Sequence, residues 1–370
     1  MLPVSYDCKT AIVCPLDWGL GHASRCIPVI FALQDAGYRV VVAADGLPLK
    51  FLREEMGSKV EYYVLPGRTI RYQKSGSLLF ALALQAFPFL KAVWSEHRAI
   101  KRLIEKTNAT LVVSDNRYGL FTPRAKTVII SHQLFVIIPP ALKWAEPLVW
   151  KSLQFVMTRF DHCWVPDNHD FPNLSGKLSH HDSVPSNSRF VGPLSRFSLV
   201  NPEHFINPLP TDFPGQFYLV VLSGPEPQRS ILEEMLTQQF SALRLPVVMV
   251  LGKPGEKVLS SSGTMIKTSH LNTLEMAFLL KNCQLVVCRS GYSSLMDLAV
   301  FGKKALLVPT PGQTEQEYLA EHIKESGQAF CVPQAELSLQ QHLPTAMQYG
   351  GIRILKQEGR LQDAIIGLAH

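Results

Sequence analysis

Short apolar runs rich in β-branched residues alternate along the 370-residue chain with longer segments of helical periodicity. Turn-forming residues such as Gly, Pro, Asn and Asp bound most of these runs, as they usually bound strands. The first half of the chain predicts strands over residues 10–16, 38–44, 60–66, 109–116 and 126–132, and helices from about Ser24 and over residues 47–56. This alternation is typical of a parallel sheet covered by helices.

A proline-rich interval at residues 191–215 interrupts the series, after which the alternation begins again. The second half predicts strands over residues 217–224, 245–252, 263–268, 283–291 and 303–310, and helices over residues 228–240, 273–282, 292–302 and 315–327. We therefore expect an α/β protein of two Rossmann-like, doubly wound domains that face a central cleft. The expected boundaries are 1–198 and 215–350 for the domains, 199–214 for the linker, and 351–370 for a C-terminal helix that packs back on the first domain.

Charge and cysteine content narrow the class of protein. The net charge is +6, from 36 Lys and Arg against 30 Asp and Glu, and no basic block stands out in the sequence. This favours an anionic small ligand or an acidic membrane surface, rather than nucleic acid, as the partner. The seven cysteines form no CxxC pair, which argues against disulfide or zinc frameworks and predicts reduced thiols in the cytoplasm.

Two stretches resemble membrane or metal-binding segments in composition only. Residues 77–94 are strongly apolar but are interrupted by Gln85, Pro88 and Lys91, so we expect a buried or interfacial helix rather than a membrane span. No signal peptide is expected. Residues 161–170 are rich in Asp and His but lack a ligand spacing, so no metal site is predicted.

The strand ends of the first domain carry candidate site residues, because ligands bind beyond the carboxyl ends of parallel strands. Gly19 and Gly21 allow a tight turn and a close approach to the backbone, and His22 then stands near the start of a helix. His22 is a candidate binding or reacting group, with a helix cap as the alternative. Asp115 can orient His22 as a base, or it can cap a helix. Nearby candidates are Asn116, Arg117 and His132, the last also interpretable as a buried structural histidine.

A strand-to-helix switch in the second domain predicts a phosphate site. Arg289, Ser290 and Gly291 stand at this switch, where free backbone N–H groups and the helix dipole can hold a diphosphate without a metal. Asp297 follows about two turns into the helix, within reach of ribose hydroxyls by analogy with dinucleotide sites. The alternative for Asp297 is an exposed helical carboxylate.

The sequence SGPEPQR at residues 223–229 forms a stiff loop after another strand. Its prolines have no N–H group, so an anion here is held by the amides of Gly224 and Glu226, the hydroxyl of Ser223 or the guanidinium of Arg229. The alternative is a turn that only starts the next helix.

A third loop of the second domain is rich in amides and carboxylates. Gln313, Gln316 and Glu317 supply donors and acceptors, which sugar hydroxyls require. The alternative, compatible with the first, is a capping box with Thr314 as the N-cap and Glu317 at the third helical position.

These loops together resemble the GT-B glycosyltransferases, in particular family 28, which includes the N-acetylglucosaminyltransferase that makes lipid II and the diacylglycerol glycosyltransferases. The resemblance rests on GLGHASRCIPV at residues 19–29, on residues 286–330 and, more weakly, on VVLSG at residues 220–224. It covers the donor domain well and the first domain only at its opening loop.

The resemblance implies specific roles for the candidate residues. His22 matches the glycine-loop histidine regarded as a candidate base, and Ser290 and Gly291 match the diphosphate turn. Asp297 stands where the family usually has Glu for the ribose, and Gln316 and Glu317 match a pair that contacts the donor sugar. The N-terminal glycine loop is reduced and SGPEPQR replaces a glycine-serine loop, so the donor sugar and the acceptor do not transfer from the family.

The resulting hypothesis is an inverting, metal-independent hexosyltransferase that needs no cofactor and uses a nucleotide-sugar donor, UDP-sugar in the family. The first domain holds a glycan or lipid acceptor, and residues 78–94, with Arg68, Arg71 and Lys74 ahead of them, can contact the inner face of a membrane. A core helix is the alternative for that segment. The rival functions are a nucleotide-sugar epimerase or hydrolase of the same fold and a non-catalytic donor-binding subunit.

Overall fold

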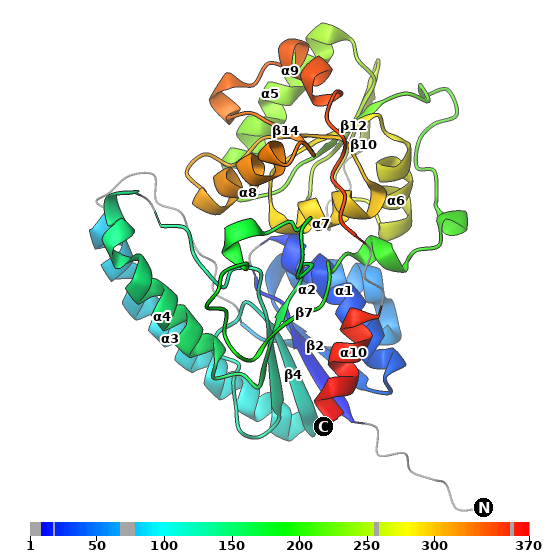
Figure 1. Cartoon of the computed structure of the whole chain (residues 1–370). Coiled ribbons are helices and arrows are strands. Elements are labelled where there is room, and N and C mark those ends of the chain that lie inside the picture. Colours follow the sequence, from blue (N-terminus) through cyan, green and yellow to red (C-terminus); the bar gives the residue numbers. More distant parts are fainter. Residues whose placement is uncertain are drawn as a thin grey trace, which may run out of the picture.

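The structure, a computed structural model, describes residues 9–17, 19–66, 78–138, 140–254, 259–355 and 359–369. It contains two α/β domains, one above the other in Figure 1. The sheet of the first domain has the order β3-β2-β1-β4-β5-β6-β7, with every neighbouring pair parallel. Its strands are β1 (Thr10–Cys14), β2 (Arg39–Ala44), β3 (Glu61–Val64), β4 (Ala109–Asp115), β5 (Lys126–Ile130), β6 (His162–Val165) and β7 (Ser188–Phe190).

Alternation along β1 explains why helices cover both faces of this sheet. Ala11 and Val13 pack into one hydrophobic core, and Ile12 and Cys14 into another, because successive strand residues point to opposite faces. The first core includes residues of α1 (Leu20–Asp35) and α2 (Gly46–Met56); the second includes residues of α3 (Leu78–Thr107) and α4 (Glu146–Met157). Short 3₁₀ helices lie at η1 (Gly57–Lys59), η2 (Pro140–Ala145) and η3 (Gly176–Leu178).

The second domain repeats this strand order and adds an edge strand. Its sheet has the order β10-β11-β9-β8-β12-β13-β14, in which β10 alone is antiparallel to its neighbour. The strands are β8 (Tyr218–Val221), β9 (Val247–Val250), β10 (Leu259–Ser262), β11 (Met265–Thr268), β12 (Leu285–Cys288), β13 (Ala305–Leu307) and β14 (Phe330–Cys331). The helices are α5 (Gln228–Leu243), α6 (Thr273–Asn282), α7 (Tyr292–Phe301), α8 (Thr314–Glu325), η6 (Gln334–Glu336) and α9 (Leu339–Ala346).

The proline-rich interval is packed between the domains. Leu194 and Phe197 are buried, and the 3₁₀ helix η4 (Arg196–Leu199) contacts α1 as well as α6 and α7. A second 3₁₀ helix, η5 (Pro202–His204), follows. The start of the interval therefore packs between the two domains. Its composition indicated a linker and did not indicate this packing.

Further contacts join the second domain and the C-terminal segment to the first domain. Helix α1 lies against α7, and the C-terminal helix α10 (Arg360–Ile366) lies against α1. The 3₁₀ helix η7 (Gly367–Ala369) ends the described chain, where Lys126 Nζ donates to the carbonyl of Leu368 at 2.6 Å. Helix α1 begins at Leu20 and not near Ser24, so Gly19 is its N-cap and Gly21 lies within its first turn.

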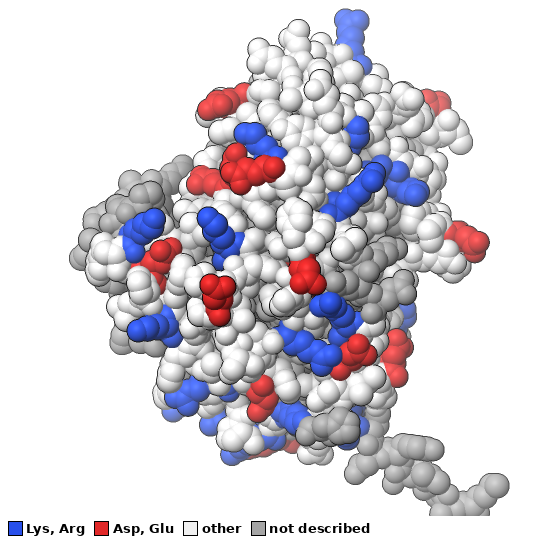
Figure 2. Space-filling view, viewed as in Figure 1, with Lys and Arg blue, Asp and Glu red and all other residues white. Residues whose placement is uncertain are grey.

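The predicted fold is confirmed, with two doubly wound domains of matching strand order. Figure 2 shows Lys, Arg, Asp and Glu side chains interspersed over one face of the molecule. Within the described residues, no helix is long and apolar enough to cross a membrane.

Candidate active site

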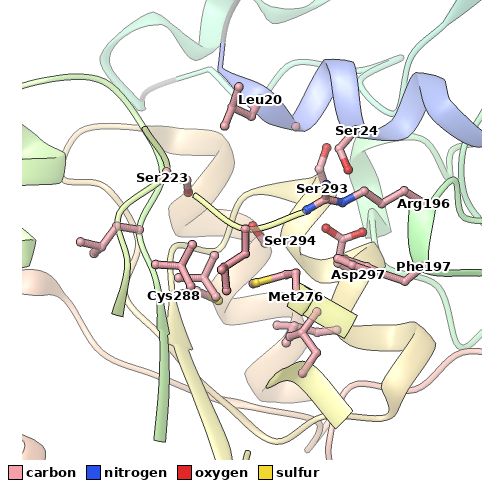
Figure 3. Close-up of a pocket in the computed structure, with 18 of the residues that line it drawn as sticks. Leu20, Ser24, Arg196, Phe197, Ser223, Met276, Cys288, Ser293, Ser294 and Asp297 are labelled. Atoms are coloured by element: carbon pink, nitrogen blue, oxygen red, sulfur yellow. The ribbon is translucent and has the colours of Figure 1, made fainter. Parts of the chain in front are cut away.

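A cavity of about 130 Å³ opens between the domains, beyond the carboxyl ends of β8, β9 and β12. Figure 3 shows Leu20 and Ser24 of α1 on one side and Ser294 and Asp297 of α7 on the other. Residues from both domains and from the interval between them line it, among them Gly21, Phe51, Arg196, Phe197, Ser223, His270, Met276 and Ser293. The site is therefore built only when the two domains meet.

Asp297 lies at this cavity and not on an exposed helix face. Its Oδ1 accepts the hydroxyl proton of Ser195 at 2.6 Å. Burial raises the pKa of Asp297 to about 6, against the opposing effects of the Ser195 hydrogen bond and of Arg196. The alternative of an exposed carboxylate is wrong, because the neighbouring domain and its connecting segment cover the helix at this position.

Arg196 joins three segments beside the cavity, and the sequence analysis did not find it. Its Nη1 donates to Glu55 of α2 at 2.7 Å and to Thr273 of α6 at 3.2 Å, and Thr273 also donates to Glu55. Its guanidinium lies 5.1 Å from the ring centroid of Phe51. Because Glu55 and Thr273 belong to different domains, Arg196 holds the two domains together at the cavity. No signal in the sequence marked it, since a lone arginine among prolines reads as exposed.

Arg196 also influences the nearby imidazole of His270. Burial, and secondarily the positive charge of Arg196, lowers the pKa of His270 to about 4. His270 is therefore neutral at ordinary pH. Its ring packs edge-on against Phe51 at 5.6 Å between centroids, which adds an aromatic wall to the cavity.

His22 stands in the first turn of α1, directly after Gly21, which lines the cavity. Gly19 precedes the helix with a φ of 80°, which favours glycine, and the turn brings His22 toward the end of β4. There the His22 Nδ1 lies 3.2 Å from Oδ1 of Asp115, the last residue of β4. The structure thus brings together the two residues predicted as base and orienting carboxylate. The His22 side chain is 15% exposed and that of Asp115 is fully buried, so only His22 is open to a substrate.

Arg25, one turn after His22, completes this group, and the sequence analysis missed it. Its Nε donates to Asp115 Oδ2 at 2.7 Å and its Nη2 donates to Asp115 Oδ1. Although burial opposes ionisation, the Arg25 guanidinium, together with His22, holds the pKa of Asp115 well below its usual range. Asp115 is therefore a carboxylate in the interior of the protein.

The Nδ1 atom of His22 lies between a donor and an acceptor. It is 3.0 Å from Arg25 Nη2, which only donates, and 3.2 Å from Asp115 Oδ1, which only accepts. In the tautomer with a proton on Nδ1, this proton is donated to Asp115 and Nε2 is the basic nitrogen. In the other tautomer, Nδ1 accepts from Arg25.

His132 extends the group to the second domain. Arg25 Nη1 lies 3.2 Å from His132 Nδ1, which must accept because a guanidinium only donates. His132 Nε2 then donates to Glu315 of α8 at 2.7 Å. Burial lowers the pKa of His132, which favours this neutral form. The imidazole is indeed buried, but it links the domains rather than filling a core, and it also stacks on Tyr292 with 3.9 Å between ring centroids.

The predicted diphosphate turn lies at the start of α7. Gly291 is its N-cap, and no described side chain caps the helix, so the first N–H groups of α7 remain available. The hydroxyl of Ser290 donates to the carbonyl of Gln316 at 2.7 Å. Ser290 is fully buried, and its side chain joins this turn to α8.

The two arginines expected to bind the diphosphate instead form hydrogen bonds and ion pairs with groups of the protein. Arg289 is fully buried and donates to the backbone carbonyls of Val308, Pro309 and Gln228 and to the side chain of Gln334, and burial lowers its pKa to about 10. Arg229 is buried and pairs with Glu226, Glu233 and the Leu251 carbonyl. Neither guanidinium faces the turn as a free cation, so both anchor loops instead, which corrects the expectation for these residues.

The loop after β4 also differs from expectation. Arg117 is buried, and it donates to Glu96 at 2.9 Å and to the backbone carbonyls of Leu65 and Pro66. It fastens α3 and the end of β3 to the sheet, so its expected acceptor-side role is not supported by its position. Asn116 adopts a φ of 52°, and its Oδ1 is buried without a partner in the described part of the chain. Its side chain is the remaining acceptor-side candidate of this loop.

The loop before α8 is preorganised by its own side chains. Gln316 accepts from the amide of Thr310 at 2.9 Å and donates to Gln313 at 2.6 Å, and Glu317 accepts from the amide of Gly312 at 3.0 Å. Helix α8 begins at Thr314 with Gln313 as its N-cap. The predicted capping box with Thr314 as N-cap is therefore wrong by one residue.

The remaining predicted residues lie beside the cavity or outside the described part. Ser223 lines the cavity, and Gly224 follows with a φ of 98°. Arg68, Arg71, Lys74 and most side chains of residues 78–90 lie outside the described residues, as does Trp18. Among the described side chains, no group of three or more His, Cys, Asp or Glu is arranged to hold a metal ion.

Comparisons with known proteins agree with this architecture. Residues 219–350 match the glycosyltransferase family 28 C-terminal domain. A UDP-N-acetylglucosamine–N-acetylmuramyl-(pentapeptide) pyrophosphoryl-undecaprenol N-acetylglucosamine transferase of Rhizobium etli is 24% identical over 334 residues, 86% of this chain and 81% of the relative. An uncharacterized glycosyltransferase of Methanosarcina acetivorans is 25% identical, covering 84% of this chain and 82% of the relative.

Solved structures are similar over nearly the whole chain. The glycosyltransferase of kitacinnamycin has a TM-score of 0.65 at 14% identity, covering 97% of this chain and 93% of its own. Acinetobacter baumannii MurG has a TM-score of 0.55 at 15% identity, covering 98% and 99%. The chain is therefore a glycosyltransferase with the GT-B fold, an enzyme that moves a sugar from a nucleotide sugar. Within that class it is family 28-like.

Proposed function

We propose that this enzyme transfers a sugar from a UDP-sugar to a hydroxyl of a lipid-linked acceptor, with inversion and without a metal ion. The observation that carries the proposal is the His22–Asp115 pair at the start of α1, the helix that contacts α7 and whose Gly21 and Ser24 line the same cavity as Asp297. One domain thus offers a base and the other offers a phosphate turn. A direct displacement needs these two groups on opposite sides of the anomeric carbon.

The proton transfer uses the basic nitrogen of His22. His22 Nε2 takes the proton of the acceptor hydroxyl while that oxygen forms a bond to the anomeric carbon. The bond from this carbon to the diphosphate oxygen breaks, and the nucleoside diphosphate leaves with the electron pair. Asp115 holds the Nδ1–H of His22 and stabilises the imidazolium that forms.

The leaving diphosphate lies at the N-terminus of α7. The N–H groups after Ser290, which no described side chain caps, and the positive end of the helix dipole stabilise its charge. Asp297 accepts from the ribose hydroxyls, two turns further along the same helix. Gln316 and Glu317 bind the hydroxyls of the donor sugar from the loop that their own side chains fix.

The first domain holds the acceptor. Support for a lipid-linked acceptor comes from the names of relatives, such as the Rhizobium etli enzyme, whose name includes a pyrophosphoryl-undecaprenol. Asn116 is a candidate contact for this acceptor, because its buried Oδ1 has no partner in the described structure and it directly follows Asp115. His132 accepts from Arg25, which also donates to Asp115, so His132 acts on the base indirectly.

An exposed face of α4 and of the turn before it supports contact with the inner face of a membrane. Trp144, Leu148 and Phe155 are 74%, 67% and 60% exposed. They recur at helical spacing together with the exposed cations Lys151 and Arg159, so apolar and basic side chains share one face. Such a face matches an anionic lipid surface, in which the apolar groups insert while the cations meet the headgroups. Helix α4 lies at the edge of the first domain in Figure 1, alongside α3, and both contribute to one hydrophobic core.

The experiment that tests the proposal combines binding and turnover. Calorimetric titration with nucleoside diphosphates and their sugars, without added metal, is followed by a transfer assay with an undecaprenyl diphosphate-linked sugar as acceptor. We expect selective binding of uridine diphosphate and an inverted product. Free sugar or an epimer formed from the donor alone would point to a hydrolase or epimerase. Donor binding with no turnover on any acceptor would point to a binding subunit.

A further inference from the structure

Helix α8 of the second domain is seated on the first domain along one face. Glu315, Tyr318 and His322 share this face because they are three and four residues apart. Glu315 accepts from His132, the Tyr318 hydroxyl accepts from the amide of Lys177 at 2.7 Å, and His322 donates to the carbonyl of Asn173 at 3.2 Å. The face thus forms a specific contact between the domains.

Glycine at position 176 makes this close seating possible. A Cβ atom at Gly176 would overlap the Tyr318 hydroxyl and lie 3.0 Å from the His322 ring, and Gly176 has a φ of 50°. The first domain therefore leaves room for α8 at this point. These contacts determine where α8 lies along the domain boundary as well as how close it lies to the first domain.

The same helix carries the loop proposed to bind the donor sugar. Gln316 and Glu317, next to Glu315, hold the backbone of residues 310–313 through the amides of Thr310 and Gly312. The carbonyl of Gln316 also accepts from Ser290 in the phosphate turn. Movement of α8 on its seat therefore moves the sugar loop and the phosphate turn with it.

From Glu315 a chain of buried hydrogen bonds leads to His22. His132 donates to Glu315 and accepts from Arg25, and Arg25 donates twice to Asp115, which accepts from His22. Arg25 and Asp115 are 1% and 0% exposed, so neither has water as an alternative partner. From Glu315 to Asp115 each link has one workable direction of donation, because Arg25 only donates and the carboxylates only accept. At His22, the proposed base is the tautomer that donates its Nδ1–H to Asp115.

We propose that Glu315, His132 and Arg25 are positioning residues, through which the seating of α8 sets the orientation of the His22 base. The inference rests on the proposed transfer function and deepens it. When α8 leaves its seat, His132 loses the acceptor that fixes its Nε2–H tautomer, and Arg25 loses the acceptor at His132 Nδ1. Arg25 is then held through Asp115 alone, so the carboxylate and the His22 Nδ1 beside it lose one of the contacts that fix their orientation. The base is in place only while the donor loop is docked.

Tyr292 gives the donor turn a second contact with the same imidazole. It is the first residue of α7, its ring stacks on His132 with an interplanar angle of 2°, and its hydroxyl donates to the carbonyl of Pro166 at 2.9 Å. His132 is therefore held both by the sugar-loop helix and by the phosphate-turn helix. Two separate parts of the donor domain converge on one residue that contacts Arg25.

The test compares two substitutions on the same face of α8. Glu315→Ala removes the link to His132, whereas Tyr318→Phe removes only the hydrogen bond to Lys177 and leaves the chain to His22 intact. We expect Glu315→Ala to lower kcat by about 10- to 100-fold, as misplacement of a reacting group does, with donor KM changed by less than about twofold. Tyr318→Phe should keep the wild-type kcat, and Glu315→Gln, which still accepts from His132, should restore part of it.

A readout that does not need turnover separates this inference from the proposed function. The charged and titratable groups around His22 in the described structure are Asp115, Arg25, His132, Glu315, Cys26 and Tyr292. NMR of labelled histidine, assigned through His22→Gln, should show a change in the His22 ring resonances in Glu315→Ala, because Arg25 and Asp115 beside the ring take another orientation. Tyr318→Phe should leave these resonances unchanged.

The outcomes are distinct. If the His22 resonances change as expected but the wild-type protein transfers no sugar, the transfer function fails and the coupling stands. If both variants lower kcat equally, or if Glu315→Ala changes neither kcat nor the His22 resonances, α8 acts only as packing and the positioning roles are overturned.

Discussion

Ser195, in the segment between the two sheets, donates its hydroxyl proton to Asp297 of α7 at 2.6 Å. The bond ties the connecting segment to the helix that begins at the phosphate turn. It also leaves one carboxylate oxygen of Asp297 for the cavity that Asp297 lines. The ionisation of this carboxyl is therefore expected to govern donor binding.

Donor affinity should depend on pH through Asp297. Burial raises its pKa to about 6, and the ionised form is the better acceptor for ribose hydroxyls. Affinity for a UDP-sugar, whose diphosphate does not titrate in this range, should rise as the pH increases through this value and level off above it. Asp297→Asn should weaken binding at pH 8 by about 10- to 100-fold, the equivalent of a hydrogen bond to a charged group. Calorimetry from pH 5 to pH 8 measures both effects.

The comparison with the variant provides the control. The amide introduced by Asp297→Asn does not ionise in this range, so the profile of the variant should be flat where the wild type rises. An equal slope in both proteins would place the titrating group elsewhere.

Loss of the base should reduce turnover but not donor binding. His22→Ala removes the proton acceptor, and Asp115→Asn removes the carboxylate that orients it and stabilises its charged form. Each should lower kcat by about 10²- to 10⁴-fold, the usual contribution of general base catalysis. Steady-state transfer assays measure kcat, and calorimetry of the same preparations should give donor Kd values near the wild type for His22→Ala.

Asp115→Asn carries a structural risk, because Arg25 loses its charged partner in the interior. Circular dichroism of that variant is therefore needed alongside the assay. Full kcat in a folded His22→Ala protein would contradict the proposed base.

The contact between Gly21 and Ser293 should limit how the domains meet. A Cβ atom at Gly21 would lie 2.8 Å from Ser293 Oγ and 2.9 Å from its Cβ. Gly21→Ala should therefore push α1 away from α7 and lower kcat/KM by about tenfold or more, because small misplacements are costly in catalysis. Ser293→Ala in the same background should not help, since the Cβ remains.

Ser293→Gly removes both close atoms and should recover much of the activity of Gly21→Ala. A double-mutant cycle of kcat/KM measures this coupling. Additive effects of the two substitutions would mean that the two positions do not meet during turnover.

The α4 face should bind anionic vesicles. Phe155→Asp removes a large exposed apolar group and adds a charge of the wrong sign. We expect binding to phosphatidylglycerol vesicles in co-sedimentation to fall by about tenfold or more, from the transfer free energy of one large apolar side chain. Added salt should weaken the wild-type binding.

Ile231 in the second domain, 40% exposed, supplies the matched control. Ile231→Asp should leave vesicle binding unchanged. Equal loss in both variants, or no vesicle binding by the wild type, would contradict a membrane contact through α4.

Features within one sequence segment were predictable, and features that join distant segments were not. The turn at Ser290 and Gly291 was predicted because a strand, a glycine and a helix follow each other directly. The pairing of His22 with Asp115 was predicted as one of two alternatives, the other being a helix cap, because both residues lie in strand-end loops of one sheet. Arg25 was missed because a charged residue in a helix reads as exposed, and its partner lies 90 positions away.

The contacts between the domains could not be predicted from the sequence, for the same reason. Glu315 reads as an ordinary first-turn acid of α8, yet it meets His132 183 positions earlier in the chain. Arg196 lies in an interval whose prolines indicated a linker, and only the packed structure places it between Glu55 and Thr273. For Arg289 and Arg229 a role was predicted that the structure does not support. These cations beside the phosphate turn were expected to bind the diphosphate, but they bind carbonyls and carboxylates of the protein.

The burial of Arg289 has a chemical consequence for the leaving group. In the proposed mechanism, charge compensation at the described part of the turn comes from peptide dipoles and not from a side chain that can lose a proton. Peptide dipoles do not titrate. Stabilisation of the diphosphate by the turn should therefore not change over the working pH range. The pH should then affect the binding of the ribose and the deprotonation of the acceptor, but not the departure of the nucleotide.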